Sequence, residues 1–320
     1  MGLIEGMSNR ATATAPITTN AAAPAALVWT ALGIVYVVWG STYLGIKIAV
    51  DAGLPPLVSG GARFIVAGLL LAAVIAARQD ARALRVSPRQ LASAALAGTL
   101  LLFGGNGLVM VAEQTVPSGL AALMIAAVPL WIVVIRRVTG DRPSRSTIVG
   151  VLVGLAGLAV LCLPGSSATG AGLVGIVLLV FAPIFWSMGS FLSSRVAMPD
   201  DPFVATVWEM LAGGSVMLVV GSARGELAGF SPAEVSPSGW LALAYLVVFG
   251  SIAAFTSYVW LLQNVRLSLV ATYAYVNPVV AVFLGALILD EAVTWPILVG
   301  GAIVVLGVGV VVSTERPRPA

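Results

Sequence analysis

Histidine is absent from this 320-residue chain, and cysteine occurs once, as Cys162 inside an apolar stretch. Without histidine the chain lacks the commonest metal ligand, the usual general base and the usual proton relay. A single cysteine excludes an internal disulfide and a metal site built from several cysteines. These absences argue against enzymes whose hydrolase chemistry depends on histidine, and we expect no cofactor and no bound metal.

Charged residues are also scarce. They make up 9% of the chain, whereas 59% of the residues are hydrophobic; an ordinary globular domain carries about 25% charged residues. A water-exposed surface could not be assembled from this composition, so the sequence predicts an integral membrane protein in contact with the lipid bilayer. The net charge of +3 comes from basic residues in short loops, so no nucleic-acid partner is implied.

Ten apolar segments predict an all-α chain with ten transmembrane helices. Their expected ranges are 27–47, 57–77, 90–111, 116–135, 146–163, 171–192, 203–221, 239–261, 269–289 and 295–312. Residues 1–26 carry no apolar run, so we expect a disordered tail without a secretory signal. Residues 314–320 form a second predicted tail.

The chain repeats itself once, at an offset of about 149 residues. The segment SGLAALMIAAVPLWIVVI matches SLVATYAYVNPVVAVFLG in spacing when Pro129 is aligned with Pro278. After a shift of one residue, Asp141 aligns with Glu291. The matches occur in the same order in both halves, which predicts a tandem duplication of a five-span unit. The two predicted repeats span residues 27–163 and 171–313.

An odd number of spans in each repeat has a topological consequence. The second repeat enters the membrane upside down relative to the first, which gives a pseudo-twofold axis in the membrane plane. Inverted repeats are typical of secondary transporters, whose halves enclose a site near the midplane and open to either side in turn. A channel could share the architecture, but no span carries the acidic or carbonyl-rich filter sequence expected of an ion pore.

Basic residues fall mostly on one side of this topology. If the amino terminus is cytoplasmic, 13 of the 16 lysines and arginines lie in cytoplasmic segments. Lys47 and Arg224 lie outside, and Arg63 lies within a span. This bias predicts that both termini are cytoplasmic. We expect a multi-pass protein of the cytoplasmic (inner) membrane of a bacterium.

Four ordered motifs carry a family resemblance. They are VVWGSTYLGIKIAV, ARFIVAGLLL, PSGLAALMIAAVPL and AYVNPVVAVFLGALILDEAVTWPILVGGAIVVLGV. Over residues 28–313 the chain resembles the EamA family of the drug/metabolite transporter superfamily. The resemblance implies ten helices and export of amino acids, other metabolites or drugs by alternating access. It also implies a central cavity lined mainly by the first, third, fourth, sixth, eighth and ninth helices. Asp141 departs from the family pattern, in which a glutamate is common.

Aromatic and polar side chains recur at helical spacing in the first span. Tyr36, Trp39, Tyr43 and Lys47 form one stripe. Ser41 and Thr42 add a small polar patch beside Trp39 at membrane depth, and Trp186 and Ser187 are approximate counterparts in the second repeat. A cavity wall explains this pattern, and so does an interfacial aromatic belt with a snorkelling lysine.

The ninth predicted span contains a proline near its middle. Because Pro278 has no N–H, the carbonyl of Ala274 loses its helical partner, and a polar group has to approach it in lipid. Tyr273 and Asn277 would share one face, and a kink between packed helices is the alternative explanation. An aromatic, hydroxyl-rich and uncharged wall fits a neutral or zwitterionic small molecule. The candidate cavity residues are Trp39, Ser41, Thr42, Tyr43, Asn106, Trp186, Ser187, Tyr258, Tyr273, Tyr275 and Asn277, and the candidate bending positions are Pro129, Pro183 and Pro278.

Two ionisable residues lie within spans, at equivalent positions of the two repeats. A charge there costs about 2.5 to 3.5 kcal/mol on insertion scales. Arg63 and Glu209 would differ in depth, so no direct ion pair is expected. Arg63 is expected to snorkel outward or to meet a substrate carboxylate, and Glu209 to bond a neighbouring helix or to take up a proton. Glu113 is expected to be a solvated cap.

These features predict a secondary transporter that exports small neutral or zwitterionic metabolites, including amino acids and drugs. A passive facilitator is the alternative. An intramembrane enzyme would need paired catalytic groups at one depth, and the loop carboxylates Asp141 and Glu291 lie on opposite sides. Gly150 and Gly154 form a GxxxG pair, which points to close helix contact within the chain or across a homodimer.

Overall fold

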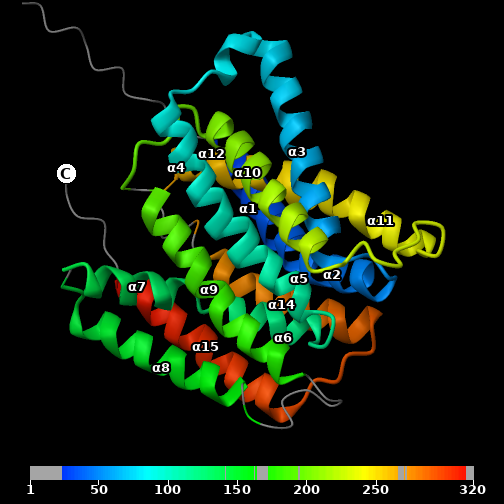
Figure 1. Ribbon diagram of the computed structural model, residues 1–320. Coiled ribbons are helices and arrows are strands. Elements are labelled where there is room, and N and C mark those ends of the chain that lie inside the picture. The colour runs from blue at the N-terminus through cyan, green and yellow to red at the C-terminus, as the bar shows by residue number, and fades with distance from the viewer. Residues whose placement is uncertain are drawn as a thin grey trace, which may run out of the picture.

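The computed structural model describes residues 24–140, 142–161, 163, 172–193, 195–265, 270 and 272–314, and the elements in them are helices (Figure 1). Eight helical spans are long and apolar enough to cross a membrane, and two further apolar helices are shorter. Together they give ten spans, as predicted from the sequence. Cys162 and Asp141 lie outside the described residues.

The first repeat contributes five spans. In chain order these are α1 (Ala25–Ile34), η1 (Val35–Trp39) and α2 (Gly40–Asp51); α3 (Pro56–Gln79), which the short η2 (Ala81–Leu84) follows; α4 (Pro88–Gly98), η3 (Thr99–Gly107) and α5 (Leu108–Ala112); α6 (Ser118–Ile125) and α7 (Val128–Val138); and α8 (Arg145–Leu161).

The second repeat follows the same order. Its spans are α9 (Leu173–Ser193); α10 (Pro202–Ala223); α11 (Pro237–Tyr245), η4 (Leu246–Ala253) and α12 (Ala254–Asn264); α14 (Tyr273–Ile288); and α15 (Trp295–Thr314). Because each repeat has five spans, the second runs through the membrane in the opposite sense to the first.

Equivalent helices of both repeats begin with a proline. Pro56 and Pro202 open α3 and α10, and Pro88 and Pro237 open α4 and α11. Proline is favourable at the first helical position because its missing N–H would be unpaired there in any case. The residue before α4, Ser87, adds a capping box with Gln90. These four helix starts lie within two residues of the starts predicted from the sequence, 57, 90, 203 and 239.

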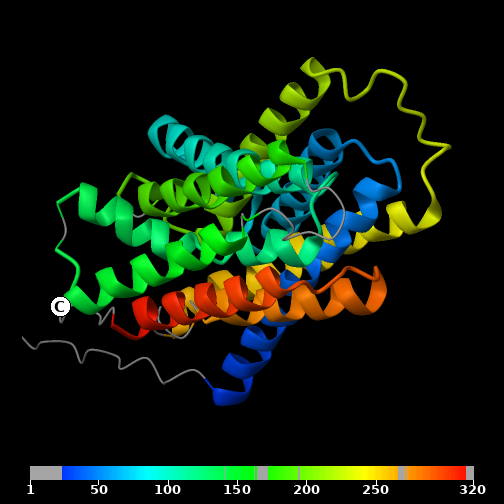
Figure 2. The same ribbon diagram turned by 90° about the horizontal axis from the view of Figure 1, so that it is seen from below.

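Equivalent helices also pack against each other across the repeats. The most extensive helix contacts join α8 to α15 and α3 to α10, and both views show α8 and α15 side by side (Figures 1 and 2). At these crossings glycines let the backbones approach. A Cβ on Gly61 would lie 2.6 Å from the carbonyl oxygen of Gly214, and one on Gly150 would lie 3.0 Å from that of Gly307. The predicted contact of the GxxxG pair within the chain is confirmed.

Three spans contain a π-helical stretch near their middle: η1 in the first, η3 in the third and η4 in the eighth. The stretches η3 and η4 occupy equivalent spans of the two repeats. Such stretches are frequent at functional sites because the wider turn re-aims side chains and carbonyl groups. All three spans border the cavity described below.

Loops alternate between two faces of the helix bundle. One face carries the loop ends around Arg78, Arg82, Arg85, Arg89, Arg136, Arg137 and Arg195, and we refer to it as the arginine-rich face. The opposite face carries Asp51, Glu113, Glu226, Glu234, Asp290 and Glu291, and we refer to it as the acidic face. Between them the outer surface is apolar, with side chains such as Leu241 (73% exposed) and Leu152 (62%) directed outward, as lipid contact requires.

Candidate functional site

A central cavity lies between the two repeats. Its empty volume is about 810 Å³, including the part that is open to solvent. The first repeat lines it with Trp39, Thr42, Tyr43, Ile46, Arg63, Gly105, Asn106, Val109, Ala122, Ile125, Ala126 and Val128, and the second with Ala182, Trp186, Phe255, Tyr273, Ala274, Asn277 and Pro278. The six spans named from the family resemblance all contribute. The second span contributes as well, through Arg63.

Seven candidate residues line this cavity: Trp39, Thr42, Tyr43, Asn106, Trp186, Tyr273 and Asn277. Three others lie in the walls behind it. Ser41 Oγ lies 2.7 Å from the carbonyl oxygen of Val37 and 2.6 Å from the hydroxyl of Tyr245. Ser187 is fully buried, and its hydroxyl donates to the carbonyls of Val128 and Pro183. The third is Tyr258, whose ring makes a tilted contact with the ring of Trp39. The side chain of Tyr275 lies outside what the structure describes.

Trp39 is held in the wall by one hydrogen bond and a group of aromatic rings. Its indole nitrogen donates to the carbonyl of Gly250, 3.2 Å away in η4. The ring centroid lies 5.3 Å from that of Phe255, 4.9 Å from that of Tyr258 and 5.3 Å from that of Tyr273. Tilted and edge-to-face contacts of this kind fix ring orientation. The first, eighth and ninth spans therefore share one rigid aromatic wall.

Trp186 enters the cavity because the third span lacks side chains opposite it. A Cβ on Gly105 would lie 2.7 Å from Cε3 of Trp186, and one on Gly104 would lie 2.7 Å from Cβ of Phe185. Only glycine allows helix α9 to pack this closely on η3. The neighbouring Asn106 then adds its amide to the same wall.

Asn277 and Pro278 of the ninth span line the cavity. Asn277 is 7% exposed. When the side-chain amide is oriented with its nitrogen toward the neighbouring carbonyl groups, Nδ2 donates to the backbone carbonyls of Tyr273 and Tyr36, each 3.2 Å away. Ala274, whose carbonyl loses its helical partner to the proline, also lines the cavity. The freed polar group therefore lies beside the cavity rather than against lipid.

The candidate bending positions differ in their local structure. The fourth span is interrupted just before Pro129, where α6 ends at Ile125 and α7 begins at Val128. Pro183 and Pro278 instead lie inside α9 and α14, which continue through them.

Arg63 points into the protein and does not snorkel outward. It is 3% exposed, lines the cavity, and donates from Nε to Ser251 Oγ at 2.8 Å. Glu209 lies half-buried on α10 and is not among the residues that line the cavity. The structure gives no ion pair between these two described residues, in line with the difference in depth predicted from the sequence.

Carboxylates from the second repeat cap helices of the first on the acidic face. Glu291 accepts hydrogen bonds from the backbone N–H groups of Ser118 (2.7 Å) and Gly119 (3.0 Å) at the start of α6. In the same way Glu226 accepts from Leu57 (2.9 Å) and Val58 (3.0 Å) at the start of α3. A carboxylate at a helix amino terminus is favourable because unpaired N–H groups and the positive end of the helix dipole meet there.

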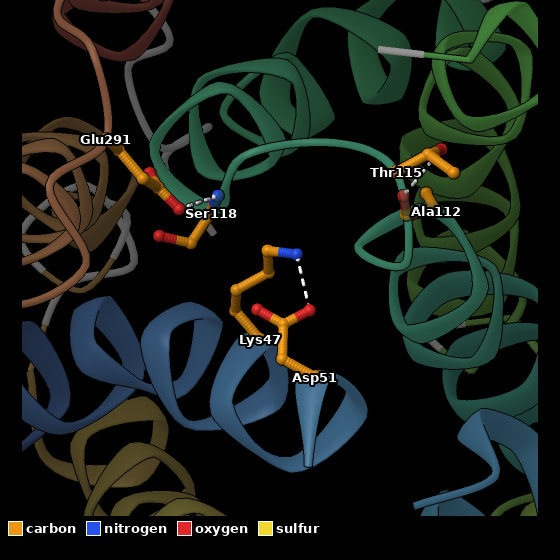
Figure 3. A network of polar contacts seen from close by, with 6 residues as sticks. All are labelled: Lys47, Asp51, Ala112, Thr115, Ser118 and Glu291. Atoms are coloured by element: carbon orange, nitrogen blue, oxygen red, sulfur yellow. Dashed lines mark hydrogen bonds and ion pairs between the residues drawn. The ribbon is translucent and has the colours of Figure 1, made fainter. Parts of the chain in front are cut away.

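Glu113 lies beside this capping network, directly after the last residue of the third span. The prediction of a solvated cap is wrong, because the side chain is completely buried and neither carboxylate oxygen has a hydrogen-bond partner. Burial raises the pKa of Glu113 well above its ordinary value of 4.5. The negative charges of Glu291 and Asp51 add to this rise, whereas Lys47 opposes it. Figure 3 shows Lys47 paired with Asp51, 2.7 Å apart, near the Glu291 cap.

The described residues contain no group of three or more histidine, cysteine, aspartate or glutamate side chains that could hold a metal ion. The wall of the central cavity presents aromatic rings, two amides and one guanidinium. Cavities of this composition orient a small molecule through a few polar contacts on an apolar surface.

Comparisons with known proteins agree with this architecture. The EamA-like transporter family matches residues 27–163 and 173–313, one match in each repeat. The chain is 42% identical over 257 residues to the "Uncharacterized inner membrane transporter YedA" of Escherichia coli strain K12, covering 80% of both chains. It is 25% identical over 300 residues to the "Uncharacterized transporter YvbV" of Bacillus subtilis, covering 90% of this chain and 92% of that one.

A solved crystal structure also superposes on the fold, with a TM-score of 0.60 at 22% identity, over 91% of this chain and 98% of that chain. At that identity the likeness concerns the fold alone. The two matched segments together cover most of the ten spans. This chain is therefore a member of the EamA-like transporter family and not an enzyme.

Proposed function

We propose that this protein is a secondary transporter that exports small neutral or zwitterionic metabolites, such as amino acids, by alternating access. The observation that carries the proposal is the central cavity, which seven spans of both repeats line with aromatic and polar groups at membrane depth. A lipid-facing aromatic belt would not turn Trp39, Asn106 and Asn277 toward one another. A shared chamber between inverted repeats is the arrangement that rocking transporters use.

The contacts on the acidic face support alternating access. Glu226 and Glu291 belong to the second repeat, and each caps a helix of the first. If the repeats rock apart at this face, these hydrogen bonds have to break. Their loss can be offset by water or by a new partner at the exposed helix ends. The caps are therefore suited to hold this face closed in one state of the cycle.

Cellular placement follows from the arginine distribution and from a relative. The relative YedA is called an inner membrane transporter. We place this chain in the inner membrane of a bacterium, with both termini and the arginine-rich face in the cytoplasm. Export then carries the substrate from the arginine-rich face to the acidic face.

The proposal can be tested in cells that overproduce the protein. Growth resistance and excretion are measured for the twenty amino acids and a panel of small drugs, with Trp39→Ala as the cavity variant and Leu241→Ala as the lipid-facing control. Equal amounts of each protein in the membrane are required. At least one compound should be exported by the wild type and by the control and not by Trp39→Ala. The proposal fails if no compound distinguishes the cavity variant from the control.

A passive facilitator would have the same cavity as a coupled exporter. The two are distinguished by whether the protein can accumulate its substrate against a concentration gradient. Everted membrane vesicles are placed in a solution of a compound identified in the screen, and uptake of the compound is followed with and without a proton gradient. A coupled exporter accumulates the compound above its outside concentration, whereas a facilitator only equilibrates it. Equilibration alone would assign the facilitator role.

A further inference from the structure

Among the described residues that line the central cavity, Arg63 is the only one with an ionisable side chain other than tyrosine. It lies on α3, eight residues into the second span, and is 3% exposed. A charge at this depth is costly unless a partner compensates for it. The buried guanidinium of Arg63 therefore requires a partner of negative charge.

The described surroundings of Arg63 are neutral. Nε donates to the hydroxyl of Ser251 at 2.8 Å, and the guanidinium carbon lies 4.7 Å from the ring centroid of Phe64. Gly250 leaves room for Nη2, because a Cβ there would lie only 3.1 Å from it. These three contacts fix the direction of the side chain, but none of them carries a negative charge.

One nitrogen of the guanidinium is left without any partner. Nη1 is buried and makes no hydrogen bond to any residue that the structure describes. None of the described carboxylates lies within 4.0 Å of the Arg63 guanidinium. A guanidinium has five N–H donors in a planar fork that matches a carboxylate in two-point geometry. The unpaired N–H donors of the Arg63 guanidinium therefore lack a carboxylate, the group whose geometry they match best.

We propose that Arg63 binds the carboxylate of the transported molecule inside the central cavity. This inference rests on the proposed transport function and narrows its substrates to small molecules with a single carboxylate. A bound carboxylate would supply both the missing hydrogen-bond acceptor and the missing negative charge. A second carboxylate on the same molecule would have no cationic partner in the cavity wall, so dicarboxylates are disfavoured.

The rest of the wall is suited to the remainder of such a molecule. The described lining contains no aspartate or glutamate, so an ammonium group would meet aromatic faces and amide oxygens there. Trp39, Tyr273 and Asn106 supply these, and a cation over an aromatic face is attracted to it. Zwitterionic α-amino acids with an apolar side chain combine all these features.

The test compares acids with their carboxamides. Purified protein in detergent is titrated with each of the twenty amino acids and with the matched amino-acid amides, and binding is followed by calorimetry. The amide keeps the ammonium group and the side chain but removes the negative charge. Wild-type protein should bind at least one acid tighter than its amide, by about 10- to 100-fold.

Arg63→Gln should remove this preference, so that acid and amide bind equally within about twofold. Arg63→Lys keeps the charge without the fork and should retain part of the preference. Lys47→Gln is the matched control, because Lys47 is a cation at the acidic face that is not among the residues lining the cavity, and its removal should leave the preference unchanged. Size-exclusion profiles show that each variant is folded.

The outcomes separate this inference from the proposed function. If Arg63→Gln keeps the wild-type ratio of acid to amide affinity, the carboxylate site is wrong. If the wild type exports compounds in a Trp39-dependent manner but binds acids and amides equally, the transport function stands and the carboxylate site is again wrong. If no compound is bound or exported, both proposals fail.

Discussion

The carboxylate of Glu291 accepts a hydrogen bond from the backbone N–H of Ser118, 2.7 Å away, although 173 positions separate the two residues. The contact joins the loop before the last span to the start of the fourth span, so it connects the two repeats at the acidic face (Figure 3). A one-residue change at this point therefore tests both helix capping and the closure of this face.

Glu291→Gln should lower the thermal stability of the protein. It keeps the size of the side chain but removes the charge from two hydrogen bonds at a helix amino terminus, which costs about 1 to 2 kcal/mol. For a protein of this size we expect a fall in Tm of about 2 to 6 °C, measured in detergent. Glu234→Gln changes an exposed acid on the same face and should leave Tm nearly unchanged. Equal shifts in both variants would contradict a capping role.

Glu113 should make stability fall as pH rises. Because burial raises the pKa of Glu113 well above 4.5 in the folded protein, the folded state binds its proton more tightly than the unfolded state does. Stability contributed by this group is complete below the ordinary pKa, is lost as pH rises toward the raised pKa, and then levels off. Unfolding temperatures measured between pH 5 and about pH 9 should show this decline.

The control for this decline is Glu113→Gln, which resembles the protonated carboxyl group and cannot titrate. The variant should lose most of the pH dependence and exceed the wild type in Tm at alkaline pH. At acidic pH the two should be alike. If the variant shows the same slope as the wild type, other groups cause the decline.

The helices and much of the cavity wall could be predicted from the sequence because both depend on local patterns. Apolar runs of about twenty residues give the spans. Polar side chains within the spans, such as Asn106 and Asn277, have to face protein rather than lipid, so their positions in the sequence indicate the wall of a cavity or a helix contact. The expected starts of the third and eighth spans, 90 and 239, lie two residues after Pro88 and Pro237, where the helices begin.

The parts that sequence reasoning missed depend on contacts between the repeats. Glu113 is buried near Glu291 of the other repeat, and the role of Glu291 depends on a helix start more than 170 positions away. Ser187 has a polar side chain at the expected depth, but its hydroxyl is satisfied by backbone carbonyls behind the cavity. The direction of Arg63 depends on Gly250 and Ser251, which belong to the other repeat.

Gly98→Ala should destabilise the protein, whereas Gly33→Ala should not. A Cβ at position 98 would overlap the backbone of Glu209 on α10, and backbone cannot move aside as a side chain can. Such overpacking costs about 1 to 3 kcal/mol. A Cβ at position 33 would meet nothing within 4 Å. Because alanine has a higher helix propensity than glycine, Gly33→Ala should raise the free energy of unfolding by about 0.5 to 1 kcal/mol. Opposite shifts of Tm in detergent are the expected result, and a stable Gly98→Ala variant would refute the close approach of α4 and α10.

Glu209 remains a candidate for proton coupling because it is an ionisable residue within a span. Glu209→Gln should abolish transport driven by a proton gradient in proteoliposomes while leaving the exchange of a compound between the two sides intact. The compound is one identified by the excretion screen, and Glu234→Gln is the control. Gradient-driven flux that equals the wild-type value would assign Glu209 a structural role between α10 and α4.

The inverted arrangement predicts opposite accessibility for equivalent positions of the repeats. Arg89 and Ser238 each follow the proline that opens the third span of their repeat by one residue, and both are exposed. Single cysteines at these positions, in a background with Cys162→Ala, are treated in intact cells with a reagent that does not cross the inner membrane. Cysteine at 238 should react and cysteine at 89 should react only after the membrane is permeabilised, because they lie on the acidic and arginine-rich faces. Labelling of both or of neither would mean that the repeats are not antiparallel, and labelling of position 89 alone would mean that the termini lie outside the cytoplasm.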